Sequence, residues 1–378
     1  MAYTETTTTS YGSNLGNSFK GIVGGIILFI AAFPILFWNE SRAVKTADAL
    51  EEGAAAVVSV ASDTIDSANE GKLIHITGQA KTDAVLTDTT FGISVPAMAL
   101  ERIVEMYQWE EKSHSEQRDK LGGGTETVTT YTYSKGWFTR AIDSSSFKEQ
   151  GHDNPGGMPY EGLKNFAPSA TVGAFVLSQQ QISNMSPEKT YQLPANVAAP
   201  AGFVKSENYY YKGANIANPQ IGDVRVSFKM SDPQQPVSMV GKQTGSNITS
   251  YTTSNGHAIN MFKRGTESAE AMFQSAKDSN KMMTWIIRLV CFFMMFTGLK
   301  MVFAPLAALG KVIPILGTIV GGATSVVAFL IALVCFFVAV AIAWFAARPV
   351  LGIGLLVVAA AGLVALFIFK KKKKAAAA

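Results

Sequence analysis

Long uncharged runs stand at both ends of the chain, and a polar stretch lies between them. Residues 21–38 and 319–347 contain no charged side chain. Eighteen helical residues rise about 27 Å, which is close to the hydrocarbon thickness of a bilayer. Residues 284–303 carry charges only near the ends of the run, and residues 350–369 end at a block of lysines. This pattern predicts four transmembrane helices, one N-terminal and three C-terminal.

The segments that flank these runs complete the division of the chain. Residues 1–20 form a short polar N-terminal tail, 304–318 a connector or interfacial segment, and 370–378 a polybasic C-terminal end. Residues 267–281 have helical character and are expected to continue into the second span. A cleaved signal peptide is the alternative for 21–38. Large charged residues follow that run instead of a small-residue cleavage site, which favours an uncleaved anchor.

Residues 39–283 form the polar middle, which is long enough to bury a core of its own. Several short runs in it alternate apolar and polar positions, the pattern of half-buried strands. The clearest runs are 72–77, 98–109, 125–133 and 222–230. Gly, Asn and Asp between such runs favour antiparallel pairing. The expected fold class is therefore an α+β membrane protein with a large β-rich extramembrane domain between the first and second transmembrane helices.

Charge divides the chain in the same way. Residues 40–283 hold 27 of the 28 acids and 22 of the 32 bases, whereas residues 284–378 hold nine bases and no acid. A charged fraction of only 16% argues against disorder and against binding of nucleic acid. The positive-inside rule predicts that both termini are cytoplasmic and that the middle domain lies in the periplasm or in an organelle lumen.

Few side chains in the spans suggest chemistry. Arg288 is the one charge expected below the interface, where a charge is a functional candidate unless it snorkels to the headgroups. Glycines four residues apart either allow close helix packing or reflect the abundance of glycine in membrane helices. These glycines are Gly21 with Gly25, and Gly317 with Gly321. The lysines that end the last span fix topology, attract anionic lipid, or both. They are Lys370, Lys371, Lys372, Lys373 and Lys374.

No constellation in the polar middle points to catalysis or to a metal. Its four histidines show no pair at helical i, i+4 spacing, and His75 is expected to pack within a strand. Both cysteines of the chain lie in apolar runs, and glycines 122–124 lack the lysine of a phosphate-binding loop. We therefore expect a protein that is not an enzyme and that has no catalytic, cofactor-binding or metal site.

Six short segments resemble one known family in order, spacing and identity. They are FWNESRAVKT (37–46), NEGKLIHITG (69–78), VEMYQW (104–109), YSKGWF (133–138), GDVRVSF (222–228) and SNKMMTW (279–285). Together with the one-plus-three layout of spans, these segments resemble the LUMA family, also called the transmembrane protein 43 family. The resemblance covers nearly the whole chain.

The resemblance implies four spans and a large lumenal or periplasmic domain. Animal members of the family reside in the endoplasmic reticulum and inner nuclear membrane, where they self-associate and organise membrane protein complexes. Channel-related roles have also been proposed for the family. Prokaryotic members exist, and in a bacterium the same layout implies an inner-membrane protein with a periplasmic domain. The family has no catalytic motif to carry over to residues of this chain.

Three functional hypotheses follow. The first is an integral membrane scaffold that forms homo-oligomers, contacts membrane lipid, and organises other membrane proteins through its middle domain. The second is an ion channel or channel subunit formed by oligomerised transmembrane helices, which the lack of acidic residues in the spans weakens. The third and weakest is a hydrolase or a binding protein for a small ligand in the middle domain.

Overall fold

The computed structural model divides the chain into two compact units. It describes residues 2–194, 197–206, 208–310, 312 and 314–347, with the side chains of 2 and 314–318 excepted. Within the described residues, the β-rich unit consists of 2–6, 52–116 and 128–274, and the helical unit consists of 7–51, 117–127 and 275–347.

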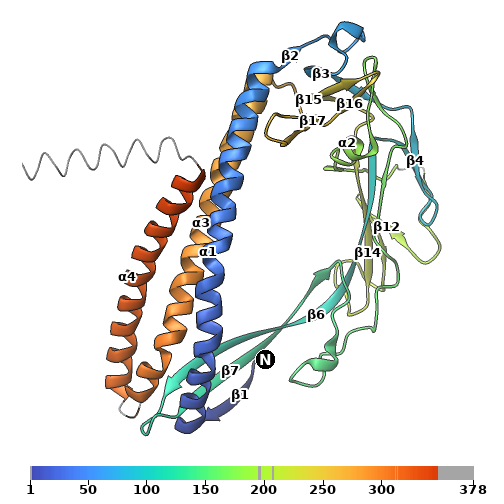
Figure 1. Ribbon diagram of the computed structural model, residues 1–378. Coiled ribbons are helices and arrows are strands. Elements are labelled where there is room, and N and C mark those ends of the chain that lie inside the picture. The colour runs from blue at the N-terminus through green and yellow to red at the C-terminus, as the bar shows by residue number, and fades with distance from the viewer. Residues whose placement is uncertain (1, 195–196, 207, 311, 313, 348–378) are drawn as a thin grey trace, which may run out of the picture. The chain divides into compact units, whose positions relative to one another are not determined.

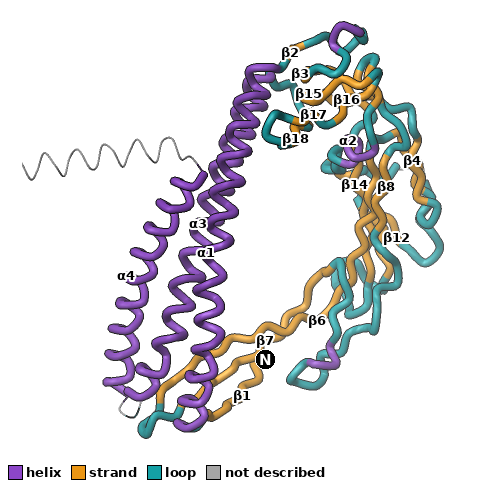
Figure 2. The backbone as a smooth tube through the Cα atoms, in the orientation of Figure 1, coloured by secondary structure: helices purple, strands orange, loops and turns teal. Residues whose placement is uncertain are grey.

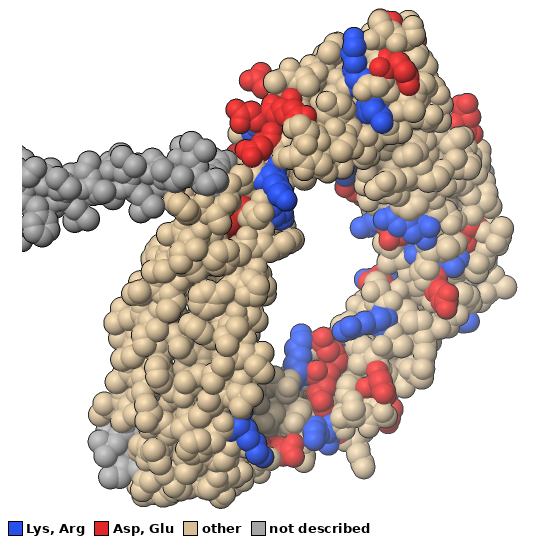
Figure 3. All heavy atoms as spheres, in the orientation of Figure 1, with Lys and Arg blue, Asp and Glu red and all other residues tan. Residues whose placement is uncertain are grey.

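Three long helices dominate the helical unit (Figure 1). They are α1 (Tyr11–Ala56), α3 (Ala269–Gly310) and α4 (Pro314–Ala347). Each is long and apolar enough to cross a membrane, yet only 17% of the apolar window of α1 and of α3, and 28% of that of α4, is buried in the protein. Figure 3 shows a long surface without charge over these helices. Lipid or another protein chain must cover this apolar surface.

Three of the expected spans lie within these helices. Residues 21–38 lie within α1, residues 284–303 within α3, and residues 319–347 within α4. The fourth expected span, 350–369, and the polybasic end, 370–378, lie outside the described residues. The structure therefore shows three helices that can cross a membrane, and a fourth span stays a prediction.

The helices extend beyond the apolar runs. α1 begins at Tyr11, inside the expected N-terminal tail, and continues to Ala56 through an alanine-rich and glutamate-rich segment that favours helix. α3 begins at Ala269, which confirms the expected continuation of that helix into the second span. Residues 304–310 belong to α3 and α4 begins at Pro314, so helix occupies both ends of the expected connector 304–318.

Small and aromatic side chains pack the three helices together. Ala32 and Leu36 of α1 and Cys291 of α3 are fully buried in this cluster. The ring of Phe292 meets the rings of Phe329 and Phe336 on α4 edge-on, with centroids 5.5 and 5.7 Å apart. Edge-to-face contacts of this kind add to the packing between α3 and α4.

Two glycines bring α1 and α3 close together. A Cβ added at Gly25 would lie 2.6 Å from the carbonyl oxygen of Gly298, and a Cβ at Gly298 would lie 2.6 Å from that of Gly25. Only residues without a side chain permit such an approach. Gly21 has no atom within 4 Å of an added Cβ, and Gly321 has one ordinary contact at 3.8 Å. The surroundings of Gly317 lie outside the described side chains.

Two sheets form most of the β-rich unit (Figure 2). In sheet order, the larger contains β1 (Ala2–Thr9), β7 (Thr125–Phe138), β6 (Ala99–Asp119), β14 (Val224–Ser231), β13 (Tyr209–Lys212) and β12 (Val204–Lys205), with β8 (Leu163–Phe166) on β6 and β11 (Lys189–Thr190) on β14. The second contains β19 (Met261–Arg264), β15 (Gln234–Thr244), β16 (Asn247–Thr249), β10 (Phe175–Val176), β9 (Thr171–Val172), β3 (Leu73–Lys81) and β2 (Val58–Ser59).

Short elements complete the unit. They are the β4 (Val85–Asp88) and β5 (Ile93–Pro96) hairpin, the β17 (Tyr251–Thr252) and β18 (Ala258–Ile259) hairpin, helix α2 (Gln179–Ser183), and the 3-10 turns η1 (Ser67–Asn69) and η2 (Ser144–Ser146). The pairings among the strands are mostly antiparallel, and β6 and β14 form a ladder of eight residue pairs.

The alternating patterns bury the expected faces. Val224, Val226 and Phe228 of β14 are all buried in one core beneath the larger sheet, which confirms the period-two prediction for this segment. A second core lies against the other sheet and includes Ile76 of β3 and Met239 of β15. Each of the two sheets therefore packs against an apolar core of its own.

The N-terminal strand β1 is an edge strand of the larger sheet and pairs with β7. The hydroxyl of Tyr131 donates a hydrogen bond to Oε2 of Glu5 at 3.3 Å, and Nζ of Lys148 lies 3.5 Å from the same oxygen. Residues 2–6, which precede α1, and residues from Glu52 onward, which end it, thus belong to the same unit.

Replacing Gly25 or Gly298 by alanine is expected to destabilise the helical unit by about 1–3 kcal/mol, because the added methyl group forces the two backbones apart. The free energy of unfolding of each variant in detergent measures this effect. Gly21→Ala is the matched control, since an added Cβ there meets no atom within 4 Å. Equal stability of Gly25→Ala and Gly21→Ala contradicts the close approach.

Candidate functional site: a buried charge pair in the helical unit

Arg288 does not stand alone in α3. Its Nε and Nη2 lie 2.7 and 2.6 Å from the two carboxylate oxygens of Glu40 on α1. Glu40 is 1% exposed, and the side chain of Arg288 is 17% exposed. A bidentate pair of this kind is both strong and directional. The one charge that the sequence predicts inside a span therefore has a partner, which lies two residues beyond the expected end of the first span.

Polar side chains of α1 and α3 surround this pair. Nδ2 of Asn39 donates a hydrogen bond to the carbonyl oxygen of Thr284 at 3.2 Å. The guanidinium of Arg42 donates to Oδ1 of Asn280 at 3.0 Å and to Oγ1 of Thr284 at 3.2 Å. Nδ2 of Asn280 donates to the carbonyl oxygen of Ala43 at 2.9 Å. These bonds fix the register of α1 against α3.

Burial makes this arrangement energetically sensitive. A buried polar group costs free energy unless a partner satisfies it, and a buried unpaired charge costs more. Asn39, Glu40 and Thr284 are each less than a tenth exposed, and each has a partner on the other helix. Nε of Arg42 is an exception, because it is buried and has no hydrogen-bond partner among the described residues.

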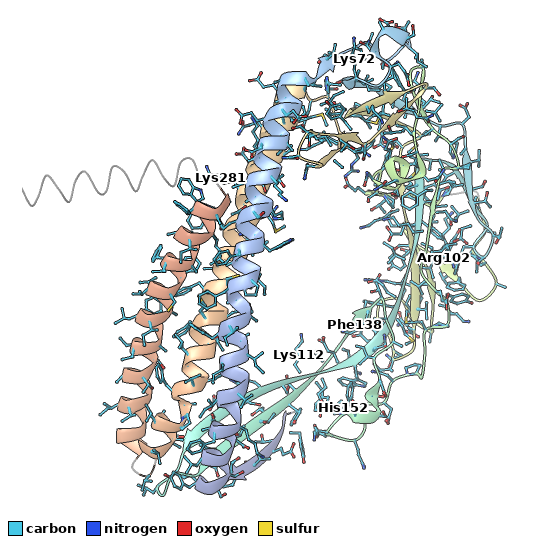
Figure 4. The ribbon with its side chains drawn as sticks, in the orientation of Figure 1. Lys72, Arg102, Lys112, Phe138, His152 and Lys281 are labelled. Atoms are coloured by element: carbon cyan, nitrogen blue, oxygen red, sulfur yellow. The ribbon has the colours of Figure 1, made fainter. Side chains whose placement is uncertain are left out.

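A groove of about 560 Å³ opens beside the charge pair. Its walls come from α1 and α3, and Trp344 of α4 closes one side. Lys277 and Lys281 line it on α3, where Figure 4 labels Lys281. The Arg288 guanidinium lies 4.8 Å from the ring centre of Trp285, a cation–π contact. The groove thus combines positive charge with aromatic surface.

The β-rich unit contains a second buried charge pair. Nη1 of Arg102 lies 3.0 and 2.8 Å from the two carboxylate oxygens of Asp88 (Arg102 is labelled in Figure 4). Nε of Arg102 donates to the carbonyl oxygen of Glu161, and its guanidinium lies 5.4 Å from the ring centre of Phe91. The pair joins the β4–β5 hairpin to β6, and its donors are directed at protein atoms. Its geometry is that of a structural contact.

The histidines do not converge on a common site. His75 is buried in β3, where its Nε2 lies 2.9 Å from the carbonyl oxygen of Glu267. Burial lowers the pKa of His75, and the hydrogen bond to Glu267 opposes this effect. The ring of His152, labelled in Figure 4, stacks on Tyr133 with centroids 4.0 Å apart and meets Trp109 edge-on. Among the described residues, no three His, Cys, Asp or Glu side chains are placed to hold a metal.

Comparison with known proteins decides the family. The sequence profile of the family described as transmembrane protein 43 matches residues 106–349. The transmembrane protein 43 of Rattus norvegicus and that of Homo sapiens are each 32% identical to this chain over 348 residues, which is 89% of this chain and 86% of theirs. This chain belongs to the transmembrane protein 43 family. The homolog from Drosophila melanogaster is 30% identical over 345 residues, covering 89% of this chain and 91% of its own length. No solved structure matches.

Membership of the transmembrane protein 43 family confirms the resemblance seen in the sequence. The profile match includes Asn280, Thr284 and Arg288 of α3, whereas Glu40 lies before it. Sequence reasoning missed Glu40 as the partner of Arg288. A signal was available in the spacing, because Asn280, Thr284 and Arg288 follow one another at intervals of four and share one face of a helix.

Removing one member of the charge pair is expected to cost about 3 kcal/mol of unfolding free energy, because the remaining charge stays buried without a partner. Glu40→Gln and Arg288→Met test each side. The double variant is expected to cost less than the sum of the single variants, which double-mutant analysis in detergent measures. Lys189→Met, which breaks the exposed pair with Asp232, is the control and is expected to leave the unfolding free energy unchanged. Strict additivity of the two changes contradicts the pairing.

Stability of the β-rich unit is expected to fall as the pH drops below the ordinary histidine pKa of about 6.5. The pKa of His75 is lower in the folded state, so the unfolded chain binds the proton first and gains stability relative to the fold. Above the ordinary histidine pKa, His75 is neutral in both states and the unit has its full stability. Stability is lost as the pH falls from that value toward the lower pKa of His75 in the folded state. Denaturant unfolding between pH ~7.5 and ~5 measures this slope.

His75→Gln is expected to reduce the slope. His114→Gln, at a side chain 81% exposed, is the matched control and is expected to retain it. A slope that His75→Gln leaves intact refutes the assignment to His75.

Proposed function

We propose that this member of the transmembrane protein 43 family is a non-enzymatic integral membrane scaffold, which self-associates and organises membrane protein complexes through its β-rich unit. The observation that carries the proposal is the way α1 and α3 are joined. Glu40 and Arg288 neutralise one another through both carboxylate oxygens, and neighbouring side chains bond across the same interface. These polar groups thus hold α1 and α3 together.

The apolar surface of the helices supports self-association. Less than a third of each apolar window is buried within one chain, so the outer faces are available to lipid and to other helices. Phe293 on α3 and Phe337 on α4 are among the large side chains that point outward, 52% and 61% exposed. The resemblance also implies self-association.

The β-rich unit supplies a surface for partners outside the membrane. It has two apolar cores and two sheets, which give it an ordered surface. In the described residues it shows buried charges that bond to protein atoms and no group of side chains suited to hold a metal. These features are typical of a binding platform.

A channel formed by oligomerised helices is the second candidate. The groove beside Glu40 and Arg288 favours it, since this is a polar cavity in a membrane-spanning unit. A conducting path needs polar groups across the full membrane thickness. Glu40 already neutralises the guanidinium of Arg288, which weakens this candidate.

Self-association is tested by labelling the purified protein with one fluorophore per chain and reconstituting it into liposomes. Single-molecule photobleaching is expected to show two or more steps per particle, and the step number is expected to persist as the ratio of protein to lipid falls. A distribution of single steps at every dilution refutes self-association.

The same liposomes separate the two candidates through ion flux. The scaffold proposal expects no flux above that of protein-free vesicles, from protein that is folded and correctly inserted. Selective flux that Arg288→Ala alters rejects the scaffold proposal in favour of the channel.

A further inference from the structure

A second cavity adjoins the groove in the helical unit. It has a volume of about 240 Å³ and lies between α3 and α4. Trp285 and Arg288 line both cavities, so the two meet at these residues. The remaining lining of the second cavity consists of leucine and phenylalanine side chains, among them Phe292, Phe329 and Leu333. We refer to it as the apolar slot.

Of the two cavities, the groove is the one with positive charge. Lys277 and Lys281 lie one helical turn apart on α3 and both line it. Neither ammonium group has a hydrogen-bond or ion-pair partner within the part of the chain that the structure describes. Glu40 is neutralised by Arg288, so Glu51 is the only other acid in the lining. Two unpaired lysines against one glutamate give the groove a net positive charge.

The two cavities lie at successive depths along α3. Trp285 and Trp344 line the groove, and tryptophan is enriched at the level of lipid headgroups. Phe292 follows Trp285 by seven residues, or about 10 Å of helix, in the direction of the apolar run. The groove is thus at headgroup level, and the slot reaches toward the hydrocarbon.

We propose that the groove and the apolar slot together bind one anionic phospholipid. Its phosphate contacts the ammonium groups of Lys277 and Lys281, and one acyl chain enters the slot between α3 and α4. A charged groove and an apolar slot that meet at one place match an amphiphile better than a soluble anion, which would leave the slot empty. The site is distinct from the proposed scaffold function and does not depend on it.

Native mass spectrometry of the full-length protein in neutral detergent tests the site. Phosphatidylglycerol is expected to bind with one tight site per chain, and phosphatidylcholine is expected to bind about tenfold more weakly. The double variant Lys277→Gln, Lys281→Gln is expected to weaken phosphatidylglycerol binding about thirtyfold, because each base near the membrane surface contributes ~1 kcal/mol to the binding of anionic lipid. The double variant Lys20→Gln, Lys300→Gln removes the same charge outside this groove and is expected to bind like the unmodified protein.

A second variant tests the apolar slot. Leu333→Trp fills the space for the acyl chain and is expected to abolish the tight site, while the midpoint of thermal unfolding shows whether the helices still pack. Phosphatidylglycerol with brominated acyl chains gives an independent readout, because bromine in the slot quenches the fluorescence of the adjacent Trp285. This quenching is expected to disappear in the Lys277→Gln, Lys281→Gln variant.

Three outcomes overturn the proposal. One is equal binding of phosphatidylglycerol by the unmodified protein and by the Lys277→Gln, Lys281→Gln variant. Another is unchanged binding by a folded Leu333→Trp variant together with no quenching by the brominated lipid. The third is displacement of the lipid by millimolar inorganic phosphate, which identifies a simple anion site.

Discussion

The ion pair between Glu40 and Arg288 is the contact on which the helical unit depends. Neither charge is stable at this depth without the other, because desolvation of an unpaired carboxylate or guanidinium costs several kcal/mol. The pair therefore forces α1 and α3 together in one register. The flanking hydrogen bonds of Asn39, Arg42 and Asn280 occur in the same register, so they add to a geometry that the charges already require. The guanidinium of Arg288 also packs over the ring of Trp285. Both residues line the groove, so the ion pair helps to shape it.

Two physically different contacts fasten α3 to α1, and a third fastens it to α4. The charge pair supplies directional electrostatics, and the approach of Gly25 to Gly298 supplies close backbone packing deeper in the apolar run. Phenylalanine rings supply the contact with α4, where Phe292 meets Phe329 and Phe336. The apolar slot lies between α3 and α4, the pair of helices joined by aromatic rings.

Hydropathy alone predicted the three described helices and the β-rich character of the middle domain, because a long apolar run or an alternating run is itself the physical cause of the element. The contacts between elements were harder to predict. Glu40 follows the first apolar run, where a charged residue is ordinary. Its partner Arg288 lies 248 residues away, so no neighbouring residue in the sequence indicates the pairing. Gly298 has no glycine four residues away, so glycine spacing along one helix does not mark it as a packing residue. Strand order and register also depend on contacts distant in the chain, such as that between β3 and β15.

The N-terminal strand decides which backbone groups the larger sheet presents at one edge. Among the described strands, β1 pairs with β7 alone, so the N–H and C=O groups on its outer side are open to a further strand. Loss of β1 would transfer this open edge to β7, which has 14 residues where β1 has 8. A longer open edge gives another chain more backbone to pair with, so the first strand limits the tendency of the larger sheet to aggregate.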